Sequence, residues 1–569
     1  MLQPPTLAPP ALTNIAATLP AMAALQPHGL AIVVPQGRDR HGKRAYTHLT
    51  YRQLDDWSDR IARGLLACGL VRGERAVLMV KPSLEFFALT FALFKAGIVP
   101  VLVDPGLGTK QLKQCIGEAE PHAFIGIPVA HVARLLLGWG RGTLRQLITV
   151  GPRLAWGGHT LGQIAAMGGE SGDPVLAKTL GEDTAAVLFT SGSTGPAKGA
   201  VYQHRHFLGQ VELIRSTYGI VPGEIDLPTF PLFALFDPAL GMTAVVPEMD
   251  FSRPAAVDPR MLAELIEDWG ITNVFGSPAL LATVVRDAQQ PGRQVRWETV
   301  KRVLSAGAPV PAAVLEGMAK ILSSNAQVFT PYGATESLPV ASIGSKQVLE
   351  QTRALTETGA GVCVGRVVPP VQVAIVAISD APIIDWQGVT LCQPNEIGEI
   401  CVSGPTTTLA YYGRPAATLG SKIEREGQLW HRMGDVGYFD NDGLLWYCGR
   451  KGHRVETATA VLHTAPVEEI FNTHPDVRRT ALVGVRVGAG VEPVLCVELA
   501  AQAKVDIPTL FEQLLALGQE FATTRAVLRF IVHPGFPVDI RHNAKIGREK
   551  LAVWAQQQIP AALSPKPRS

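Results

Sequence analysis

The chain has 569 residues, of which 47% are hydrophobic and 18% are charged, a balance typical of globular proteins and not of disordered ones. Its formal net charge of +2, without a basic helix or alternating aromatic and basic residues, argues against a nucleic-acid-binding protein. A chain of this length predicts about three to four domain-sized units.

The first segment of the chain is rich in proline and has no early positive charge, which argues against a secretory signal peptide. The longest apolar run, from Phe86 to Phe94, is interrupted by Lys95 and is too short to span a membrane. The seven cysteines are scattered and form no CxxC pair, as expected in a reducing compartment. We therefore expect a cytoplasmic protein without a transmembrane segment.

Helices and strands alternate over the first 150 residues. Apolar side chains at helical spacing predict a helix in residues 51–70, followed by a strand at 75–80, a helix at 82–97 and a strand at 98–105. This order predicts a parallel sheet covered by helices. The same alternation returns between residues 261 and 333 and predicts a second unit of the same kind.

A stretch rich in glycine and hydroxyl residues, TSGSTGPAKG at 190–199, follows a buried strand predicted at 185–190. Its backbone N–H groups and hydroxyls suit the oxygens of a phosphate. The spacing differs from the Walker A pattern of nucleotide-binding loops. On this stretch alone, a surface linker is an equally good interpretation.

The character of the sequence changes after Thr352. Short strands with glycine turns predict a smaller β-rich subdomain, and about 120 residues after Arg450 predict a compact unit of helices and strands. The charged, glycine-containing stretch GRKGHR at 449–454 is the expected hinge between them.

Five separated segments occur in one order, and together they carry a family resemblance. They are TSGSTGPAKG (190–199), SAGAPV (305–310), YGATE (332–336), MGDVGYFDNDGLLWYCGR (433–450) and NAKIGREKL (543–551). They resemble the adenylate-forming superfamily of acyl-CoA synthetases, nonribosomal peptide adenylation domains and luciferases, over nearly the whole chain.

The resemblance implies an α/β fold with two domains. A large N-terminal domain, residues 1–449, is expected to contain two parallel-sheet α/β subdomains plus a β-rich subdomain, with the ATP and acyl sites. A small, mobile α+β domain, residues 450–569, is expected to close over the site and carry the catalytic lysine. The implied chemistry is attack of a carboxylate on the α-phosphate of ATP, which yields an acyl-adenylate and pyrophosphate.

The resemblance also implies which residues bind ATP and magnesium. The expected ATP-binding residues are Thr190, Ser191, Gly192, Ser193, Thr194, Gly195, Lys198, Gly307, Ala308, Pro309, Tyr332, Gly333, Asp435 and Arg450. Of the first seven, the residues with hydroxyl or ammonium groups would hold the β- and γ-phosphates. The middle five would enclose the adenine, Asp435 would bind the ribose, and Arg450 would reach the ribose or a phosphate. Glu336 would coordinate Mg²⁺, which prefers oxygen ligands.

Three residues are the catalytic candidates implied by the resemblance: Thr335, Glu336 and Lys545. Thr335 would contact the α-phosphate. Lys545, in NAKIGREKL, would place its ammonium between the carboxylate and the α-phosphate oxygens as charge develops there.

One part of the chain departs from the acyl-CoA synthetase pattern. Thr457, Ala458, Thr459 and Ala460 stand where those enzymes carry a glycine-rich loop that lines the pantetheine tunnel, after a hinge at Lys451 or Gly452. Each Cβ narrows a path that backbone alone should line. This weakens the interpretation as a CoA ligase.

Two segments, residues 230–251 and 433–457, resemble the β-lactone synthetases of bacterial long-chain olefin biosynthesis. That resemblance implies a long-chain 2-alkyl-3-hydroxyalkanoic acid as substrate, whose own 3-hydroxyl attacks the acyl-adenylate, closes a β-lactone and expels AMP. The nucleophile is intramolecular, so no second acceptor site is needed. The implied partners are the thiolase-like, reductase and decarboxylase enzymes of the same pathway.

Some candidates stay open at the level of sequence. The alkyl chains need apolar room, which Phe230, Phe233, Leu235, Phe236, Phe275 and Leu280 could supply, although each is equally well an ordinary core residue. His204 and His206 are candidates for the base that closes the lactone; a metal site there is disfavoured because no third ligand is evident.

Two other functions remain as alternatives. One is a long-chain fatty acyl-CoA or acyl-AMP ligase, which CoA-dependent product formation would reveal. The other is a non-catalytic binding or scaffold subunit, which retention of the charged motif residues argues against.

Overall fold

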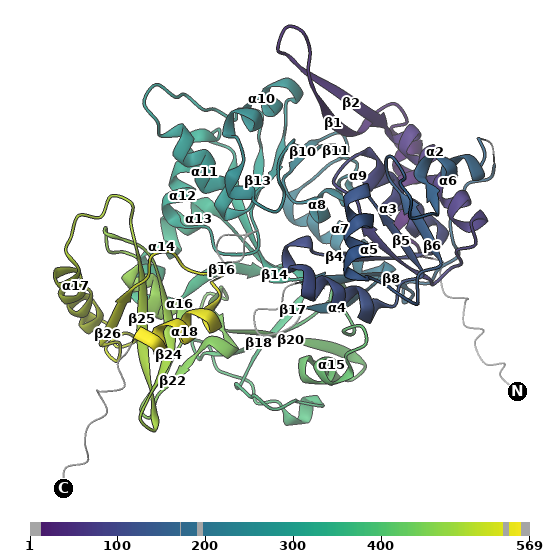
Figure 1. Ribbon diagram of the computed structural model, residues 1–569. Coiled ribbons are helices and arrows are strands. Elements are labelled where there is room, and N and C mark those ends of the chain that lie inside the picture. Colours follow the sequence, from purple (N-terminus) through teal and green to yellow (C-terminus); the bar gives the residue numbers. More distant parts are fainter. Residues whose placement is uncertain (1–12, 171, 191–196, 539–545, 559–569) are drawn as a thin grey trace, which may run out of the picture.

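The computed structural model of the protein describes residues 13–170, 172–190, 197–538 and 546–558. They form two large sheets with helices around them and a smaller sheet in the C-terminal part of the chain (Figure 1). No helix within these ranges is both long and apolar enough to cross a membrane. The mixed α/β architecture confirms the predicted fold class.

The first sheet has seven strands in the order β7-β6-β5-β3-β4-β8-β9. Its strands are β3 (Arg75–Met79), β4 (Val99–Val103), β5 (Ala123–Gly126), β6 (Gln146–Thr149), β7 (His159–Thr160), β8 (Thr184–Thr190) and β9 (Lys198–Gln203). Its helices are α2 (Tyr51–Ala67), α3 (Leu84–Ala96), α4 (Thr109–Ala119), α5 (Pro128–Leu137), α6 (Leu161–Met167) and α7 (His204–Tyr218). Neighbouring strands are parallel up to β8, and only β9 is antiparallel to its neighbour.

The predicted boundaries in this unit follow local signals. Helix α2 begins after Thr50, whose side chain accepts from the N–H of Gln53 in a capping box. Helix α3 ends at Gly97, which has a left-handed φ of 70° that a glycine adopts without strain.

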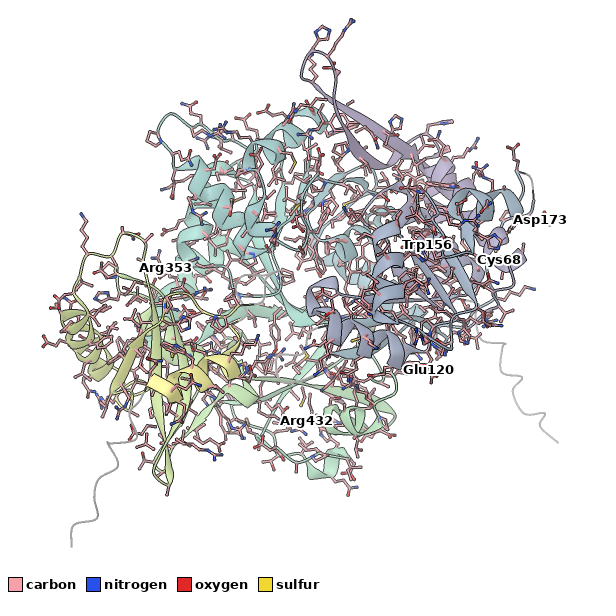
Figure 2. All side chains as sticks on the ribbon, in the orientation of Figure 1. Cys68, Glu120, Trp156, Asp173, Arg353 and Arg432 are labelled. Carbon is pink, nitrogen blue, oxygen red and sulfur yellow. The ribbon has the colours of Figure 1, made fainter. Side chains whose placement is uncertain are left out.

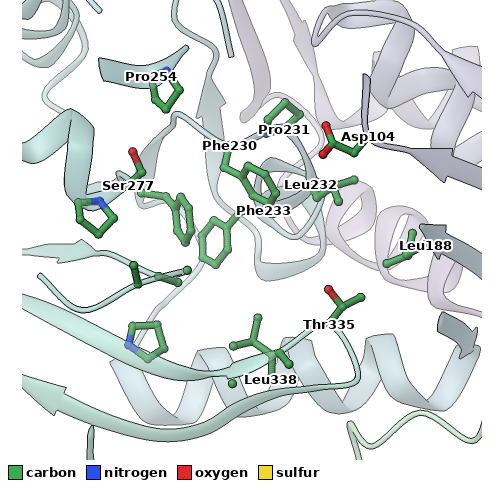
Figure 3. A pocket seen from close by; sticks show the side chains of 18 of the residues that line it. Asp104, Leu188, Phe230, Pro231, Leu232, Phe233, Pro254, Ser277, Thr335 and Leu338 are labelled. Carbon is green, nitrogen blue, oxygen red and sulfur yellow. The ribbon is translucent and has the colours of Figure 1, made fainter. Parts of the chain in front are cut away.

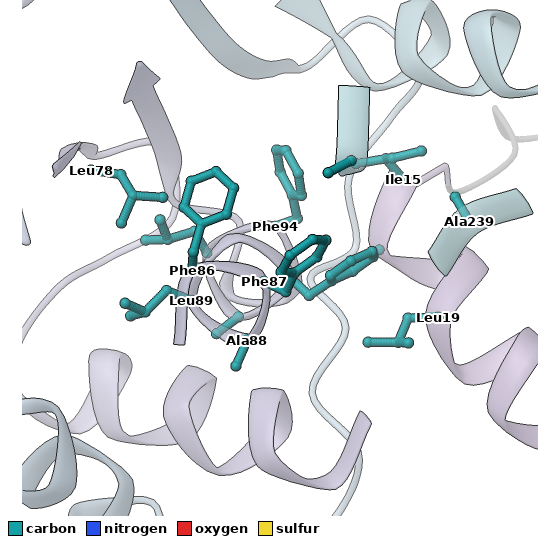
Figure 4. Close-up of a cluster of buried hydrophobic side chains, with 14 of the residues drawn as sticks. Ile15, Leu19, Leu78, Phe86, Phe87, Ala88, Leu89, Phe94 and Ala239 are labelled. Carbon is teal, nitrogen blue, oxygen red and sulfur yellow. The ribbon is translucent and has the colours of Figure 1, made fainter. Parts of the chain in front are cut away.

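Helix α3 is almost entirely apolar and is therefore buried on all sides. In Figure 4, Phe86, Phe87 and Phe94 of this helix lie in one cluster with Ile15 and Leu19 from the N-terminal segment. The helix also forms part of the cavity wall described below, so the core of this unit directly supports the site.

The one cation of α3 is neutralised within the core. The Lys95 ammonium lies 2.6 Å from the Asp55 carboxylate and 2.7 Å from that of Asp59, both on α2. A buried lysine needs such partners because removal of its charge from water is unfavourable.

The second sheet has 14 strands and joins two of the expected subdomains. Its parallel half contains β1 (Leu30–Arg38), β10 (Ile225–Pro228), β11 (Thr243–Val245), β12 (Asn273–Phe275), β13 (Arg302–Leu304) and β14 (Gln327–Ala334), with β2 (Arg44–Thr50) at the edge. Its antiparallel half contains β15 (Ser337–Gly344), β16 (Val362–Val367), β17 (Gln372–Val376), β18 (Gly398–Ser403), β19 (Lys422–Arg425), β20 (Gln428–Phe439) and β21 (Leu445–Arg450). Strand β16 pairs with both β15 and β21, so the β-rich part continues the parallel part.

Further α-helices accompany these strands along the chain. They are α1 (Thr18–Leu25), α8 (Pro231–Ala234), α9 (Asp237–Leu240), α10 (Pro259–Trp269), α11 (Pro278–Ala288), α12 (Ala312–Ile321), α13 (Ser345–Gln347), α14 (Arg353–Leu355) and α15 (Pro415–Ser421).

The C-terminal part has its own sheet and its own cores. Its elements are β22 (Val455–Glu456), β23 (Val461–Leu462), β24 (Val477–Val487), β25 (Gly490–Leu499), β26 (Arg529–Val532), α16 (Thr464–Phe471), α17 (Ile507–Glu520) and α18 (Arg548–Gln558). Strands β24, β25 and β26 form a three-stranded sheet, and β22 and β23 form a separate hairpin.

A buried charge cluster connects the two parts of the chain. The Glu399 carboxylate, 1% exposed, lies 2.6 Å from the guanidinium of Arg432, labelled in Figure 2, and 3.1 Å from the ammonium of Lys451. Lys451 is the first residue of the short 3-10 helix Lys451–His453, which follows β21. The expected hinge residue is therefore bound to the antiparallel half of the second sheet.

Candidate active site

A cavity of about 2320 Å³ lies where the two sheets and the C-terminal part meet. Most of the sequence-predicted nucleotide residues line it, although they come from segments more than 200 residues apart. Those that line it are Lys198, Gly307, Ala308, Pro309, Tyr332, Gly333, Thr335, Glu336, Asp435 and Arg450.

Asp435 is held on one side of the cavity by two neighbours. The Tyr332 hydroxyl donates to its Oδ2 at 2.7 Å, and the Arg450 guanidinium lies 3.0 Å from its Oδ1. Asp435 raises the pKa of Arg450, while burial and then Asp435 raise that of Tyr332. The Asp435 carboxylate is therefore oriented beside the cavity by a hydroxyl and a guanidinium, and carboxylate oxygens are acceptors that suit the hydroxyls of a ribose.

Glu336 is oriented by a tyrosine that the sequence did not reveal. The Tyr411 hydroxyl donates to Glu336 Oε1 at 2.5 Å, and burial, followed by Glu336, raises the pKa of Tyr411. The backbone N–H of Thr408 donates to the Glu336 carbonyl at 2.8 Å. The ammonium of Lys198 lies 5.0 Å from the centre of the Tyr411 ring, so it approaches the same corner.

These residues fit a magnesium ion that is bound partly by phosphate. Among the residues that the structure describes, no group of three or more histidine, cysteine or acidic side chains could hold a metal ion alone. Mg²⁺ in nucleotide sites usually takes one or two carboxylates, with phosphate and water oxygens completing its shell. Glu336 offers such a carboxylate.

Two further polar residues near Glu336 were not predicted. The buried ammonium of Lys422 donates to the Thr408 carbonyl, and burial lowers its pKa to about 7. His431 lines the cavity, and burial and then Lys422 hold its pKa well below its usual range. Neither stands in a recognisable motif, so only the fold could reveal them.

His204 and His206 lie on helix α7 and outside the cavity lining. The Nδ1 of His204 accepts from the N–H of Ile15 at 3.2 Å, and that of His206 accepts from the N–H of Gln203 at 3.0 Å. Burial lowers the pKa of His204 to about 4 and that of His206 to about 3. Neither histidine is placed to act as the base on a bound substrate.

Two predicted elements of the site fall outside the described residues. These are Ser191, Gly192, Ser193, Thr194 and Gly195 of the phosphate loop, and Lys545. Thr190, at the end of β8, pairs in the sheet with Lys198, at the start of β9. Ile546 and Arg548, which follow Lys545 closely in the chain, line the cavity.

The apolar candidates divide into two groups. Phe230, Phe233, Leu235, Phe236 and Phe275 line the cavity. Leu280 does not: it is fully buried on α11, in the core between that helix and the second sheet. Helix α11 directs this side chain inward, so Leu280 is the ordinary core residue that was one of its two interpretations.

The segment that replaces the glycine-rich loop of acyl-CoA synthetases forms an exposed turn between β22 and β23. The N–H of Thr457 donates to the Ala460 carbonyl at 2.9 Å, which closes the turn on itself. None of residues 457–460 lines the cavity.

Both a family model and individual relatives match this chain. A family model described as AMP-binding enzyme matches residues 23–412. The chain is 55% identical to an olefin beta-lactone synthetase of Xanthomonas campestris, covering 96% of this chain and 98% of the relative. It is 54% identical to an olefin beta-lactone synthetase of Stenotrophomonas maltophilia, with the same coverage.

More distant relatives are less similar. A long-chain-fatty-acid–CoA ligase of Salmonella typhimurium is 25% identical, covering 78% of this chain and 80% of the relative. The solved structure of an amide bond synthetase from Marinactinospora thermotolerans superimposes with a TM-score of 0.76 at 22% identity, covering 95% of this chain and 99% of the other. This structural likeness supports the fold alone.

Proposed function

The chain belongs to the AMP-binding enzyme family, and from this premise we propose that it converts a long-chain 2-alkyl-3-hydroxyalkanoic acid to a β-lactone. It is an ATP-dependent enzyme that activates a carboxylic acid and releases AMP. The observation that carries the proposal is the identity of 55% over 96% of the chain to an olefin beta-lactone synthetase.

The first half of the reaction forms the acyl-adenylate. A carboxylate oxygen attacks the α-phosphorus of ATP, and the bond to the bridging oxygen breaks with loss of pyrophosphate. Asp435 would accept hydrogen bonds from the ribose, and the main chain around Gly307 and Tyr332 would enclose the adenine. Lys545 would bridge the carboxylate and the α-phosphate as charge develops.

Magnesium would be held by Glu336 together with phosphate oxygens, where it would neutralise negative charge. Tyr411 fixes the orientation of that carboxylate through its hydroxyl. Fixed orientation of a metal ligand by a neighbouring hydrogen bond strengthens metal binding.

The second half of the reaction closes the ring. The 3-hydroxyl oxygen of the substrate attacks the adenylated carbonyl carbon, the hydroxyl proton is lost, and AMP leaves with the electron pair of the broken acyl–phosphate bond. The attacking group is part of the substrate, so its effective concentration is high. An acceptor tunnel is unnecessary, which agrees with the self-closed turn at 457–460.

We further propose that residues 1–449 bind both substrates and that residues 450–569 carry Lys545 over them. The cytoplasm is the proposed location. The thiolase-like, reductase and decarboxylase enzymes of the same pathway are proposed as partners.

The test is product identification by NMR without heating, because a β-lactone loses CO₂ when heated. Purified protein is incubated with ATP, Mg²⁺ and a racemic 2-alkyl-3-hydroxy acid, with CoA left out. A β-lactone formed with stoichiometric AMP supports the proposal. An acyl-adenylate that turns over only after CoA is added would instead establish an acyl-CoA ligase, the activity in the name of the relative at 25% identity.

A further inference from the structure

The wall of the cavity away from the nucleotide residues comes from two separate parts of the fold. The first, which we call the α5 arm, is formed by Val103, Ile127, Ala130, Ala133 and Trp139. The second, the α11 arm, is formed by Met249, Pro254, Ala279, Ala282, Thr283 and Arg286. The α5 arm belongs to the first sheet and its helices, and the α11 arm to the second sheet and its helices.

A cluster of phenylalanines lies in the cavity between the α11 side and the strands of the first sheet. Figure 3 shows Phe230 and Phe233 between Pro254 and Ser277 on one side and Asp104 and Leu188 on the other. The rings of Phe233 and Phe275 stack, with their centres 4.2 Å apart and their planes at 23°. Phe236 continues the cluster, with its ring centre 6.2 Å from that of Phe233.

The phenylalanine cluster is fixed to the sheet. The hydroxyl of Thr229, which precedes Phe230, donates to the Phe275 carbonyl at 2.5 Å, and the Thr229 N–H donates to the same carbonyl at 3.1 Å. The N–H of Phe233 donates to the Phe230 carbonyl at 3.1 Å. These bonds hold the segment that carries the rings in a fixed position against β12.

The two arms differ in their surroundings. The five residues that define the α5 arm are all apolar, and its Trp139 is buried. Exposed side chains border both arms, Arg286 and Glu248 at the α11 arm and Lys81 and Val129 at the α5 arm, but only the α11 arm includes polar residues, Thr283 and Arg286. Two arms with different surroundings can select two chains independently.

We propose that each arm takes one of the two alkyl chains of the substrate, and that the phenylalanine cluster lies at the branch. This inference rests on the function proposed above. In a 2-alkyl-3-hydroxy acid the chains diverge from adjacent carbons, while the carboxylate must reach Thr335 and Glu336. Each methylene buried in an arm strengthens binding by about fourfold, so two arms hold a two-chain acid far better than a straight-chain acid.

The test narrows one arm at a time. Ala133→Phe places a ring in the α5 arm, and Ala282→Phe places one in the α11 arm. Four acids are compared: long chains at both positions, a long chain only at C2, a long chain only at C3, and short chains at both. The readout is kcat/KM for pyrophosphate release, with the acid that has two short chains as the reference for each variant.

We expect kcat/KM, relative to that of the acid with two short chains, to fall by about 10–100-fold in each variant for acids with a long chain at one of the two positions. For acids with a long chain only at the other position, this relative kcat/KM should not change. The affected position should differ between Ala133→Phe and Ala282→Phe. Val132→Phe, on the same helix as Ala133 but outside the cavity lining, should leave the ratios of the unmodified protein unchanged.

Two results would overturn the proposal that each arm takes one chain. One is a fall in relative kcat/KM at the same chain position in both variants, and the other is an unchanged relative kcat/KM in both. If either variant fails to fold, as judged by its thermal melting, Ala130→Phe and Thr283→Phe test the same two arms. Failure of the proposed function looks different, because pyrophosphate would be released with the expected chain selectivity while NMR shows no β-lactone.

Discussion

The proposed nucleotide side of the cavity, around Glu336 and Asp435, and the proposed acyl side, around the phenylalanine cluster, are built by different means. On the nucleotide side, single polar contacts fix single groups, such as the 2.7 Å bond from Tyr332 to Asp435 and the 2.5 Å bond from Tyr411 to Glu336. On the acyl side, many apolar side chains from two subdomains enclose a volume, with few polar contacts. Activity should therefore respond to the removal of a single polar atom on the first side, and to changes in side-chain volume on the second side.

The largest effect is expected on the nucleotide side at Lys545. Lys545→Ala should reduce the rate of adenylation by about 10²–10³-fold, because one well-placed charge is removed from the transition state. Pyrophosphate release in single-turnover experiments measures it. Lys550→Ala, at an exposed lysine on α18, is the control and should be near neutral. Equal effects of the two substitutions would contradict the assigned role of Lys545.

The next effect concerns the tyrosine that orients Glu336. Tyr411→Phe removes one oxygen and should raise the Mg²⁺ concentration for half-maximal activity by about 10–100-fold. A magnesium titration at saturating ATP measures this shift. Tyr412→Phe is the matched control, since Tyr412 lies outside the cavity lining and faces the Arg75 guanidinium at 5.5 Å. An unchanged titration in Tyr411→Phe would show that the hydroxyl does not matter for the metal.

A smaller effect is expected on the acyl side. Phe233→Leu removes the stacking on Phe275 while retaining an apolar side chain, so KM for a long-chain acid should rise by at most about tenfold. KM for ATP should not change. Initial rates with each substrate varied in turn separate the two constants. A loss as large as that of Lys545→Ala would break the distinction between the two sides.

The smallest effect concerns the support of the phenylalanine cluster. Asp226 on β10 and Asp237 on α9 precede and follow residues 230–236 in the chain, and burial raises the pKa of both carboxyls. Both are buried, so the folded protein keeps the two carboxyls protonated at pH values above about 3.9, the pKa of an aspartate in an unfolded chain. In the unfolded chain the same carboxyls have lost their protons at these pH values. Their contribution to stability is complete below that pKa and is lost as the pH rises through the folded-state pKa values.

Melting curves between pH 5 and pH 9 test this contribution. In the double variant Asp226→Asn and Asp237→Asn, the fall in Tm over this range should be smaller than in the unmodified protein, by about 2–4 °C. Asp56→Asn, at an exposed carboxyl, should keep the original fall. A double variant with the same pH dependence would show that the pair does not titrate with unfolding.

The two sides also differ in how far the sequence predicted them. Segments such as YGATE and MGDVG predicted Glu336 and Asp435, because a polar contact requires one residue type at one place. The neighbours Tyr411 and Lys422 could not be predicted, since backbone pairing with β9 positions Tyr411 and the pairing of β19 with β20 positions Lys422.

The acyl side was predicted only in part. Apolar residues at helical spacing predict burial, but not whether a side chain faces the core or a cavity, and this is why both interpretations of Leu280 stayed open. The alternation of helices and strands predicted both parallel units, while the pairing of β16 with two strands, which joins the second unit to the β-rich part, depends on contacts distant in sequence.

The cluster of Glu399, Arg432 and Lys451 has a consequence for the response of the protein to ionic strength. Glu399 is 1% exposed, and ions in solution screen buried pairs far less than exposed ones. The attachment of Lys451 to the second sheet should therefore persist in concentrated salt. The junction between the two parts of the chain should keep its geometry at salt concentrations that screen and weaken ion pairs on the surface.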